Sequence, residues 1–332
     1  MIRLIEGFDA CSDDAKYLGK WTAIAASASM ASSGGRFNSG YLALTSASTF
    51  SRAFDPQPTW VVGFARMTTP TLHPCDILVF ADGASEQIVI RNDAAGAIAI
   101  DRGSTQLVLS NGGIITPETW AFFEIKVTIA DTGGSVLVRI NGAEVVAIDN
   151  ADTKATANAS ANTITFGGSG NAVAYARYDD IYILDGTGTI NDFQGDCRVR
   201  TLLPAADDTV QFARSTGAYN YANVDDANPD DDATWNESGT PGDKDLLAFN
   251  DLPANPGTIK CIQVSVRARK DDAGARSLRT KVNSGGTEAN GAANALGSTY
   301  LYYADVFATD PASGAAWAEA AVNSSSYGYE SL

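Results

Sequence analysis

Apolar and polar residues alternate over short segments along most of this chain. The alternation is clearest in Thr59–Met67, Phe122–Ile129 and Ser135–Ile140, which are rich in Val, Ile and Phe. A period of two residues is typical of a β-strand with one buried face. No stretch repeats apolar residues at helical spacing over three turns. The pattern therefore predicts an all-β protein.

Glycine-containing turns separate these segments. The pair Asn141-Gly142 joins two of them, and such a pair tolerates the positive φ angles that a two-residue hairpin needs. About thirteen strand candidates precede residue 204 at roughly 8–12-residue spacing, which is more than a small immunoglobulin-type sandwich holds. We therefore expect a larger jelly-roll sandwich.

The texture of the sequence changes after Pro204. Alternating segments such as Thr258–Lys270 and Thr299–Phe307 continue, but acidic and glycine-rich loops separate them. Ala315–Asn323 is the one segment that suits a helix, of about two turns. We expect two domains, a jelly-roll sandwich over residues 1–204 and a smaller β-sandwich domain over residues 205–332.

The chain is strongly acidic. It carries 23 Lys and Arg against 39 Asp and Glu, a formal net charge of −16. Neither predicted domain offers the basic surface that binds phosphates, so we expect no direct nucleic-acid binding. No apolar run approaches the roughly 20 residues of a membrane span, so no membrane association is expected. The first residues lack the apolar core of a secretion signal.

The sequence offers little acid–base chemistry. Its single histidine, His73, lies between two predicted strands, and no Gly-x-Ser-x-Gly elbow accompanies it. Asp179 and Asp180 are an acid pair on a predicted strand, but consecutive residues of a regular strand point to opposite faces. They would then not act together as the two carboxylates of a glycoside hydrolase. We therefore predict that the chain is not an enzyme and has no catalytic residue and no cofactor.

Two groups of residues are candidates for ligand contact. Asp230, Asp231 and Asp232 lie in an acidic loop that would attract Ca²⁺ weakly, although the residue order of an EF-hand is absent. A solvated loop, or a contact with a basic partner, is the alternative for these three. Tyr175 and Tyr178 are candidate glycan contacts, because aromatic faces stack on sugar rings, and core packing is their alternative.

The four cysteines are Cys11, Cys75, Cys197 and Cys261, and no two of them are close in sequence. Disulfide frameworks and zinc sites need denser Cys or His spacing than this. We expect buried, reduced thiols in a protein made in a reducing cytosol, with one or two disulfides as the alternative.

Several short segments, spread over nearly the whole chain, carry a family resemblance. They are Glu6–Asp9, Trp60–Phe64, Glu124–Val127, Val138–Gly142, Asp179–Tyr182, Asp185–Gly188, Asn191–Phe193, Asp230–Asp232, Arg269–Gly274, Ser284–Thr287 and Asp310–Trp317. Together they resemble a family of virion structural proteins of tailed bacteriophages. The predicted first domain also resembles the concanavalin-A-like lectin/glucanase (LamG-like) sandwich, which agrees with the number of predicted strands.

The resemblance implies a virion protein made in the host bacterial cytoplasm. It implies contacts with other virion proteins of the capsid or the tail, and self-association into a homo-oligomer. We therefore predict a non-enzymatic structural protein of a bacteriophage particle, as a capsid decoration or as a tail or fibre component. The alternative is a carbohydrate-binding adhesin of the host-recognition apparatus, which would contact host surface glycans.

Overall fold

The computed structural model describes residues 1–10, 20–25, 27–45, 48–167 and 175–332, and only the backbone of Tyr175. The chain divides into two compact units, Met1–Val199 and Arg200–Leu332. The sequence analysis had predicted the boundary between the two domains at Pro204. Each unit consists of antiparallel β-sheets, so the predicted all-β class is confirmed.

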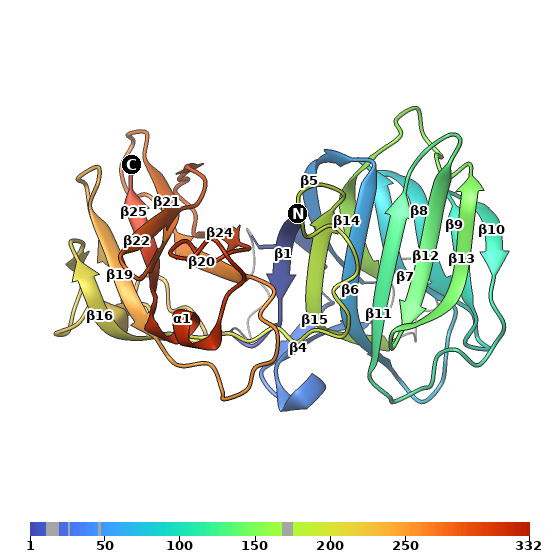
Figure 1. Cartoon of the computed structure of the whole chain (residues 1–332), viewed down its shortest axis with the longest axis horizontal. Coiled ribbons are helices and arrows are strands. Elements are labelled where there is room, and N and C mark those ends of the chain that lie inside the picture. The colour runs from blue at the N-terminus through green and yellow to red at the C-terminus, as the bar shows by residue number, and fades with distance from the viewer. Residues whose placement is uncertain (11–19, 26, 46–47, 168–174) are drawn as a thin grey trace. The chain divides into compact units, whose positions relative to one another are not determined.

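Unit 1 contains two large antiparallel sheets, which Figure 1 shows as two layers. The front sheet has the order β13 (Ala143–Ala151), β12 (Gly134–Ile140), β11 (Ala121–Thr128), β6 (Thr59–Thr68), β15 (Tyr175–Asp185), β4 (Tyr41–Thr45) and β3 (Ser29–Ala31), and β1 (Ile2–Glu6) pairs with β15. The back sheet has the order β10 (Thr105–Leu109), β9 (Ile98–Arg102), β8 (Ser85–Asn92), β7 (Cys75–Asp82), β14 (Ala161–Gly167), β5 (Thr49–Gln57) and β2 (Ala23–Ile24).

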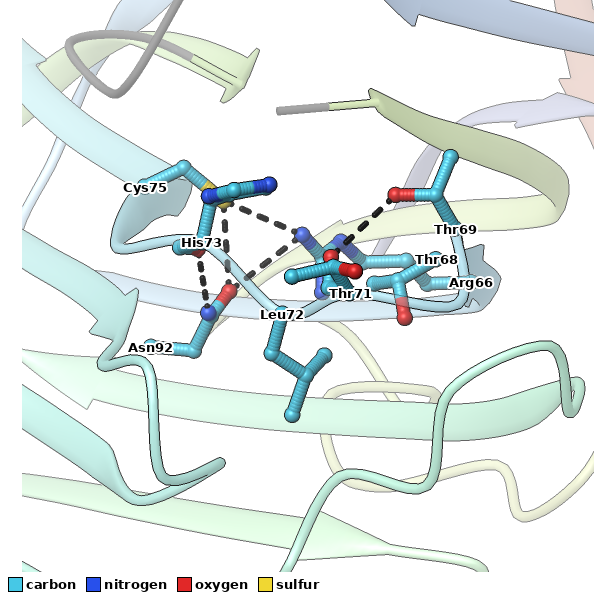
Figure 2. A pocket seen from close by; sticks show the side chains of 8 residues that line it. All are labelled: Arg66, Thr68, Thr69, Thr71, Leu72, His73, Cys75 and Asn92. Carbon is cyan, nitrogen blue, oxygen red and sulfur yellow. Dashed lines mark hydrogen bonds between the residues drawn. The ribbon is translucent and has the colours of Figure 1, made fainter. Parts of the chain in front are cut away.

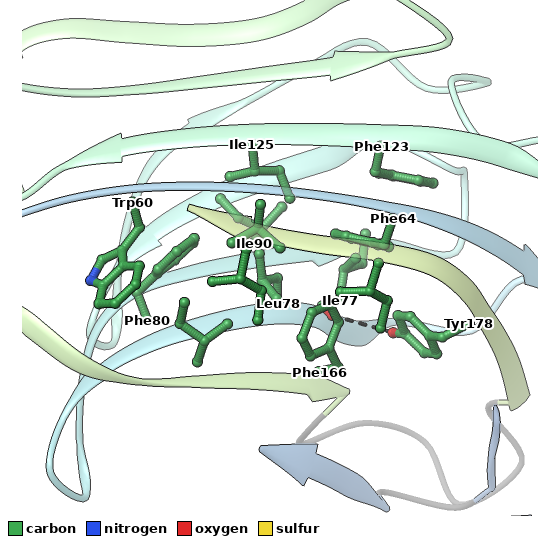
Figure 3. Packing of buried hydrophobic residues seen from close by; sticks show 14 of the residues in the cluster. Trp60, Phe64, Ile77, Leu78, Phe80, Ile90, Phe123, Ile125, Phe166 and Tyr178 are labelled. Atoms are coloured by element: carbon green, nitrogen blue, oxygen red, sulfur yellow. Dashed lines mark hydrogen bonds between the residues drawn. The ribbon is translucent and has the colours of Figure 1, made fainter. Parts of the chain in front are cut away.

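The two sheets pack face to face through the apolar positions of the alternating strands. Phe64 of the front sheet meets Phe166 of the back sheet edge-on, with ring centroids 5.3 Å apart (Figure 3). The indole N–H of Trp60 donates across the interior to the carbonyl of Ala161 at 3.0 Å, so this polar group remains paired although it is buried. Each large side chain removed from water contributes roughly 1.5–3 kcal/mol, and the core is accordingly the main stabilising element of the unit.

The hairpin between β12 and β13 has the predicted two-residue turn. Asn141 and Gly142 adopt φ angles of 50° and 79°, which are the positive values that such a turn requires. The sequence prediction at this position is confirmed.

Strand β15 contains an irregularity that the sequence analysis did not predict. Asp179 is paired with Ala65 of β6, but Tyr182 is paired with Gly63, so three steps along β15 match two steps along β6. The extra residue is accommodated by Asp180, whose φ is 51°. This is a β-bulge, and it changes which residues of β15 share a face.

Unit 2 is built from three smaller antiparallel sheets. The largest has the order β16 (Pro204–Val210), β19 (Lys244–Phe249), β25 (Ser326–Ser331), β21 (Ser277–Ser284) and β22 (Thr287–Asn290), and β23 (Asn294–Ala295) also pairs with β21. Two ribbons complete it: β17 (Ala213–Arg214) with β18 (Asn236–Glu237), and β20 (Ile262–Ala268) with β24 (Leu301–Phe307). The C-terminal strand β25 lies in the interior of the largest sheet, between β19 and β21.

The predicted helix is present but shorter than expected. Helix α1 covers Glu319–Ser324, because Ala318 is still extended at φ −100° and ψ 150°. Trp317 and Val322 are both buried in the core of unit 2 and anchor this segment. No helix in the described part of the chain is long and apolar enough to cross a membrane.

Candidate functional site

The bulge in β15 places Asp179 and Asp180 on the same face of the front sheet. Tyr178 and Ile181 both belong to the core between the sheets, so the two residues between them point to the other side. The sequence analysis had put these carboxylates on opposite faces. That inference was wrong, because it assumed a regular pleat and the bulge adds one residue to the strand.

Both carboxylates are buried and hold the same loop. Asp179 Oδ2 accepts hydrogen bonds from the Arg36 backbone N–H and the Ser39 hydroxyl, each at 2.9 Å. Asp180 Oδ2 lies 3.4 Å from Arg36 Nη1, and its Oδ1 accepts from the Val199 N–H at 2.8 Å. The pair thus fastens residues 36–39 and the end of unit 1 to the outer face of the front sheet.

Burial and mutual repulsion favour the protonated forms of this pair. Burial, followed by the neighbouring charge of Asp180, raises the pKa of Asp179 to about 8. Burial raises the pKa of Asp180 to about 6, against the opposing hydrogen bond from Val199 and the charge of Arg36. Two close carboxylates do not both ionise easily, so the pair holds a proton near neutral pH. Such shifts are common at functional sites, but here every carboxylate oxygen has a protein partner.

A second buried polar cluster lies on the same face. The Tyr182 hydroxyl donates to Glu124 Oε1 at 2.6 Å, and the Gly195 N–H donates to the same oxygen at 2.8 Å. The Tyr182 ring lies directly over Gly63, where an added Cβ would come within 2.2 Å of two ring atoms. Segment 194–199 therefore covers the outer face of the front sheet at this place, and the acidic pair and Glu124 act as its anchors.

The three calcium candidates diverge to separate partners. Asp231 forms an ion pair with Arg267 at 2.7 Å, and Asp232 forms one with Arg269 at 2.8 Å. Asp230 accepts from the backbone and hydroxyl of Thr234. No group of three or more His, Cys, Asp or Glu side chains could hold a metal ion in the part of the chain that the structure describes. Two carboxylates of this loop thus form ion pairs with basic residues of the same chain.

The structure corrects the candidate role of Tyr178 as a glycan contact. Its side chain is fully buried, and its hydroxyl donates to the carbonyl of Ile77 in the back sheet at 3.2 Å. The ring therefore has no face open to a ligand. The Tyr175 backbone pairs with Thr45, and its side chain lies outside the described residues.

His73 lies in the loop between β6 and β7, as predicted, and this loop covers a small pocket (Figure 2). The lining residues are Arg66, Thr68, Thr69, Thr71, Leu72, His73, Cys75 and Asn92. The pocket has about 190 Å³, counting the solvent at its mouth, which is below the roughly 300–1,000 Å³ of typical small-molecule sites. The His73 carbonyl accepts from the Asn92 side chain at 2.8 Å.

Three cysteines can be placed. Cys75, Cys197 and Cys261 form no disulfide among the described residues, and each is partly exposed rather than buried. Cys11 lies outside the described residues. The expected burial of the thiols is therefore wrong at these three positions, and their reduced state stays a prediction.

The described part of unit 2 carries exposed aromatic side chains. Tyr219 and Trp235 are 57% and 37% exposed, although most large aromatics of the described chain are buried. The Tyr221 ring lies 5.6 Å from that of Tyr219, and the Asn223 side chain donates to the Trp235 carbonyl at 3.1 Å. We call Tyr219, Tyr221 and Trp235 the aromatic set. The sequence analysis did not select these residues, because isolated aromatics outside alternating strands give no signal of their burial.

The chain was compared with known proteins. No protein-family model and no curated protein matches it. A cellulose-induced protein, Cip1, is 12% identical with a TM-score of 0.42 over 55% of this chain and 97% of that chain. A basic winged bean lectin is 13% identical with a TM-score of 0.38 over 54% and 97% of the two chains. The alginate lyase Aly36B is 13% identical with a TM-score of 0.32 over 44% and 80%.

These similarities concern the fold. Unit 1 is an antiparallel jelly-roll sandwich, as predicted, and lectins are among the structures to which it is similar. The bacteriophage origin stays a prediction. The prediction that the chain is not an enzyme is contradicted, because alginate lyases occur among the similar structures and this kind of sandwich carries both enzymes and lectins. We therefore do not class the chain as non-enzymatic.

Proposed function

We propose that the chain is a carbohydrate-binding structural protein of a bacteriophage particle. The observation that carries the carbohydrate-binding part is the exposure of the aromatic set, with Tyr219 57% and Trp235 37% exposed. An exposed aromatic ring offers an apolar face for stacking on a sugar ring, together with a polar edge. The particle assignment rests on the sequence resemblance, which also suggests other virion proteins and further copies of this chain as partners.

Polar groups beside the aromatic set suit sugar hydroxyls. Trp235 Nε1 lies 3.4 Å from Glu237 Oε2, so a carboxylate acceptor stands next to the indole edge. The Tyr219 and Tyr221 planes are inclined at 32°, which leaves two ring surfaces for adjacent sugar units. Because the chain has a net charge of −16, long-range repulsion disfavours acidic polysaccharides. We therefore expect neutral glycans as ligands.

Replacement of the aromatic set tests this proposal. Tyr219→Ala and Trp235→Ala should each weaken binding to a neutral bacterial surface glycan by about 3- to 10-fold, since an aromatic contact is worth roughly 0.5–1.5 kcal/mol. Binding would be measured on a glycan array and then by calorimetry with the selected glycan. Phe37→Ala is the matched control, because Phe37 is 56% exposed but belongs to unit 1.

Two results would count against carbohydrate binding by the aromatic set. The first is that no glycan on the array binds the full chain. The second is that Phe37→Ala weakens binding as much as Trp235→Ala does.

The particle assignment has its own test. Purified phage particles from the source of the gene should contain the protein, detected by mass spectrometry and located by antibody labelling in electron micrographs. Label spread over the head would indicate capsid decoration, and label confined to the tail would indicate a tail or fibre component. Particles without the protein would refute the virion assignment and leave the glycan result standing.

A further inference from the structure

Arg66 of β6 is a buried cation without a carboxylate partner. Its residue is 2% exposed, and no carboxylate among the described residues forms an ion pair with it. Its Nη2 donates to the sulfur of Cys75 at 3.3 Å and to the Asn92 side-chain oxygen at 3.4 Å, and the Tyr178 hydroxyl is a further neutral hydrogen-bond partner of the guanidinium. Arginine keeps its charge in proteins, and an isolated buried charge is costly. The cation therefore requires a compensating negative charge.

Hydrogen-bond donors around this cation outnumber the acceptors. The Nε and Nη1 groups of Arg66 are buried and have no hydrogen-bond partner, and neither has the hydroxyl of Thr68. Arg66 and Thr68 are two residues apart on one strand, so their side chains share a face. Both line the small pocket covered by the loop that carries Thr71 and Leu72 (Figure 2). The two residues that carry these unpaired donors and the uncompensated positive charge thus line the same pocket.

The neighbouring groups do not supply the missing charge. The Cys75 thiol donates to the Asn92 oxygen at 3.2 Å, as a neutral thiol does. Tyr178 lies with its ring centroid 5.9 Å from the Arg66 guanidinium carbon, and its hydroxyl proton is directed to the carbonyl of Ile77. Neither group is an anion in this hydrogen-bonding arrangement.

We propose that this pocket is a binding site for a monovalent anion of the size of chloride, held by Arg66 and Thr68. The space beside the two residues accommodates little more than one water-sized particle, so a sugar carboxylate does not enter it. A halide accepts several hydrogen bonds without donating any, which matches donors that lack acceptors. The site is independent of the proposed glycan binding, since it lies in the other unit.

Halide binding is tested on the full chain by thermal unfolding and crystallography. The unfolding midpoint should rise with chloride concentration in a saturable way, relative to sodium gluconate at equal ionic strength, because a ligand bound only by the folded state stabilises it. Crystals soaked in bromide should show an anomalous peak beside Arg66. A midpoint that does not distinguish chloride from gluconate, or bromide crystals without this peak, would overturn the proposal.

Variants separate the site from general salt effects. Arg66→Met should abolish the chloride-dependent shift, and Thr68→Val, which keeps the side-chain shape, should weaken apparent chloride affinity by about 10-fold. Thr163→Val is the matched control, because its hydroxyl bonds Asn162 outside the pocket. Equal chloride dependence in the full chain and in Thr68→Val would contradict the assignment.

A Cys75 variant addresses the competing source of negative charge. If a Cys75 thiolate neutralised Arg66, the unaltered chain would show no chloride dependence and Cys75→Ala would acquire one. That result would overturn the proposal, whereas the same chloride dependence in both proteins supports it.

Discussion

Asp180 carries the local strain of the acidic pair at the residue scale. Its φ of 51° is uncommon for residues other than glycine, and Asp and Asn tolerate it better than most. The hydrogen bond that the Asp180 carboxylate accepts from the Val199 N–H at 2.8 Å offsets this strain. Backbone conformation and side-chain function are therefore coupled in one residue.

The acidic pair predicts an unusual pH dependence of stability. The pKa of Asp179 is raised to about 8 in the folded chain, so the folded state holds a proton that the unfolded chain loses above about pH 4. The stabilisation of the folded state by this bound proton is thus fully present below pH 4 and is lost as pH rises through 8. The free energy of unfolding should fall by up to about 1.4 kcal/mol per pH unit between these limits.

Asp180→Asn should flatten this dependence. The amide tolerates the same backbone conformation and removes the charge that repels Asp179. Urea unfolding at pH 5, 6, 7 and 8 would give the difference in the free energy of unfolding between the unaltered chain and the variant. Asp208→Asn, at an exposed carboxylate, is the control. A difference that does not change with pH over this range would argue against a proton held by the pair.

Gly63 provides a second prediction at the residue scale. An added Cβ would lie 2.2 Å from the Tyr182 ring, so Gly63→Ala must displace the ring and its hydrogen bond to Glu124. We expect a loss of about 1–3 kcal/mol in the free energy of unfolding. Gly239→Ala is the control, because nothing lies within 4 Å of its Cβ position. Equal stability of the two variants in urea titrations would show that the Tyr182 ring moves without cost.

At the scale of elements, the hydrophobic pattern predicts strands well where the pleat is regular. Segment Thr59–Met67 lies within β6, and the Asn141-Gly142 turn has the expected angles, because burial alternation and turn chemistry are both local properties. The bulge in β15 escaped this reasoning. The bulge is visible in the sequence as a break in the two-residue alternation, because the core residues Tyr178 and Ile181 are three positions apart.

The candidate sites were less predictable than the strands. The exposure of Trp235 and the lack of a carboxylate partner for Arg66 depend on which distant segments pack against these residues, and a single sequence does not show such contacts. For the same reason the burial of Tyr178 was not predicted, because its place in the alternation suits either a core or a surface position. Its burial follows from contact with the back sheet through Ile77.

At the scale of the whole molecule, the two units are stabilised in different ways. Unit 1 has a continuous core of packed aromatic and aliphatic side chains between two large sheets. Unit 2 has smaller apolar clusters, and its ion pairs include Lys281 with Glu330 and Arg267 with Asp231.

We therefore predict two thermal transitions in the full chain. Unit 2 should unfold first, because its apolar clusters are smaller than the continuous core of unit 1. Differential scanning calorimetry of the full chain and of residues 1–199 checks this. The fragment should retain the upper transition alone, and an unfolded fragment would show that unit 1 depends on unit 2.

The bulge in β15 also determines how this strand tolerates length changes. Three steps of β15 match two steps of β6 between Asp179 and Tyr182, so the strand already holds one inserted residue. Deleting either Asp179 or Asp180 would leave one residue between Tyr178 and Ile181, restore an even ladder and keep Ile181 and Ile183 facing the core. A one-residue deletion elsewhere in β15 would instead turn the apolar side chains beyond it toward the other face. The strand thus can lose one codon at this acidic pair without inverting the sheet.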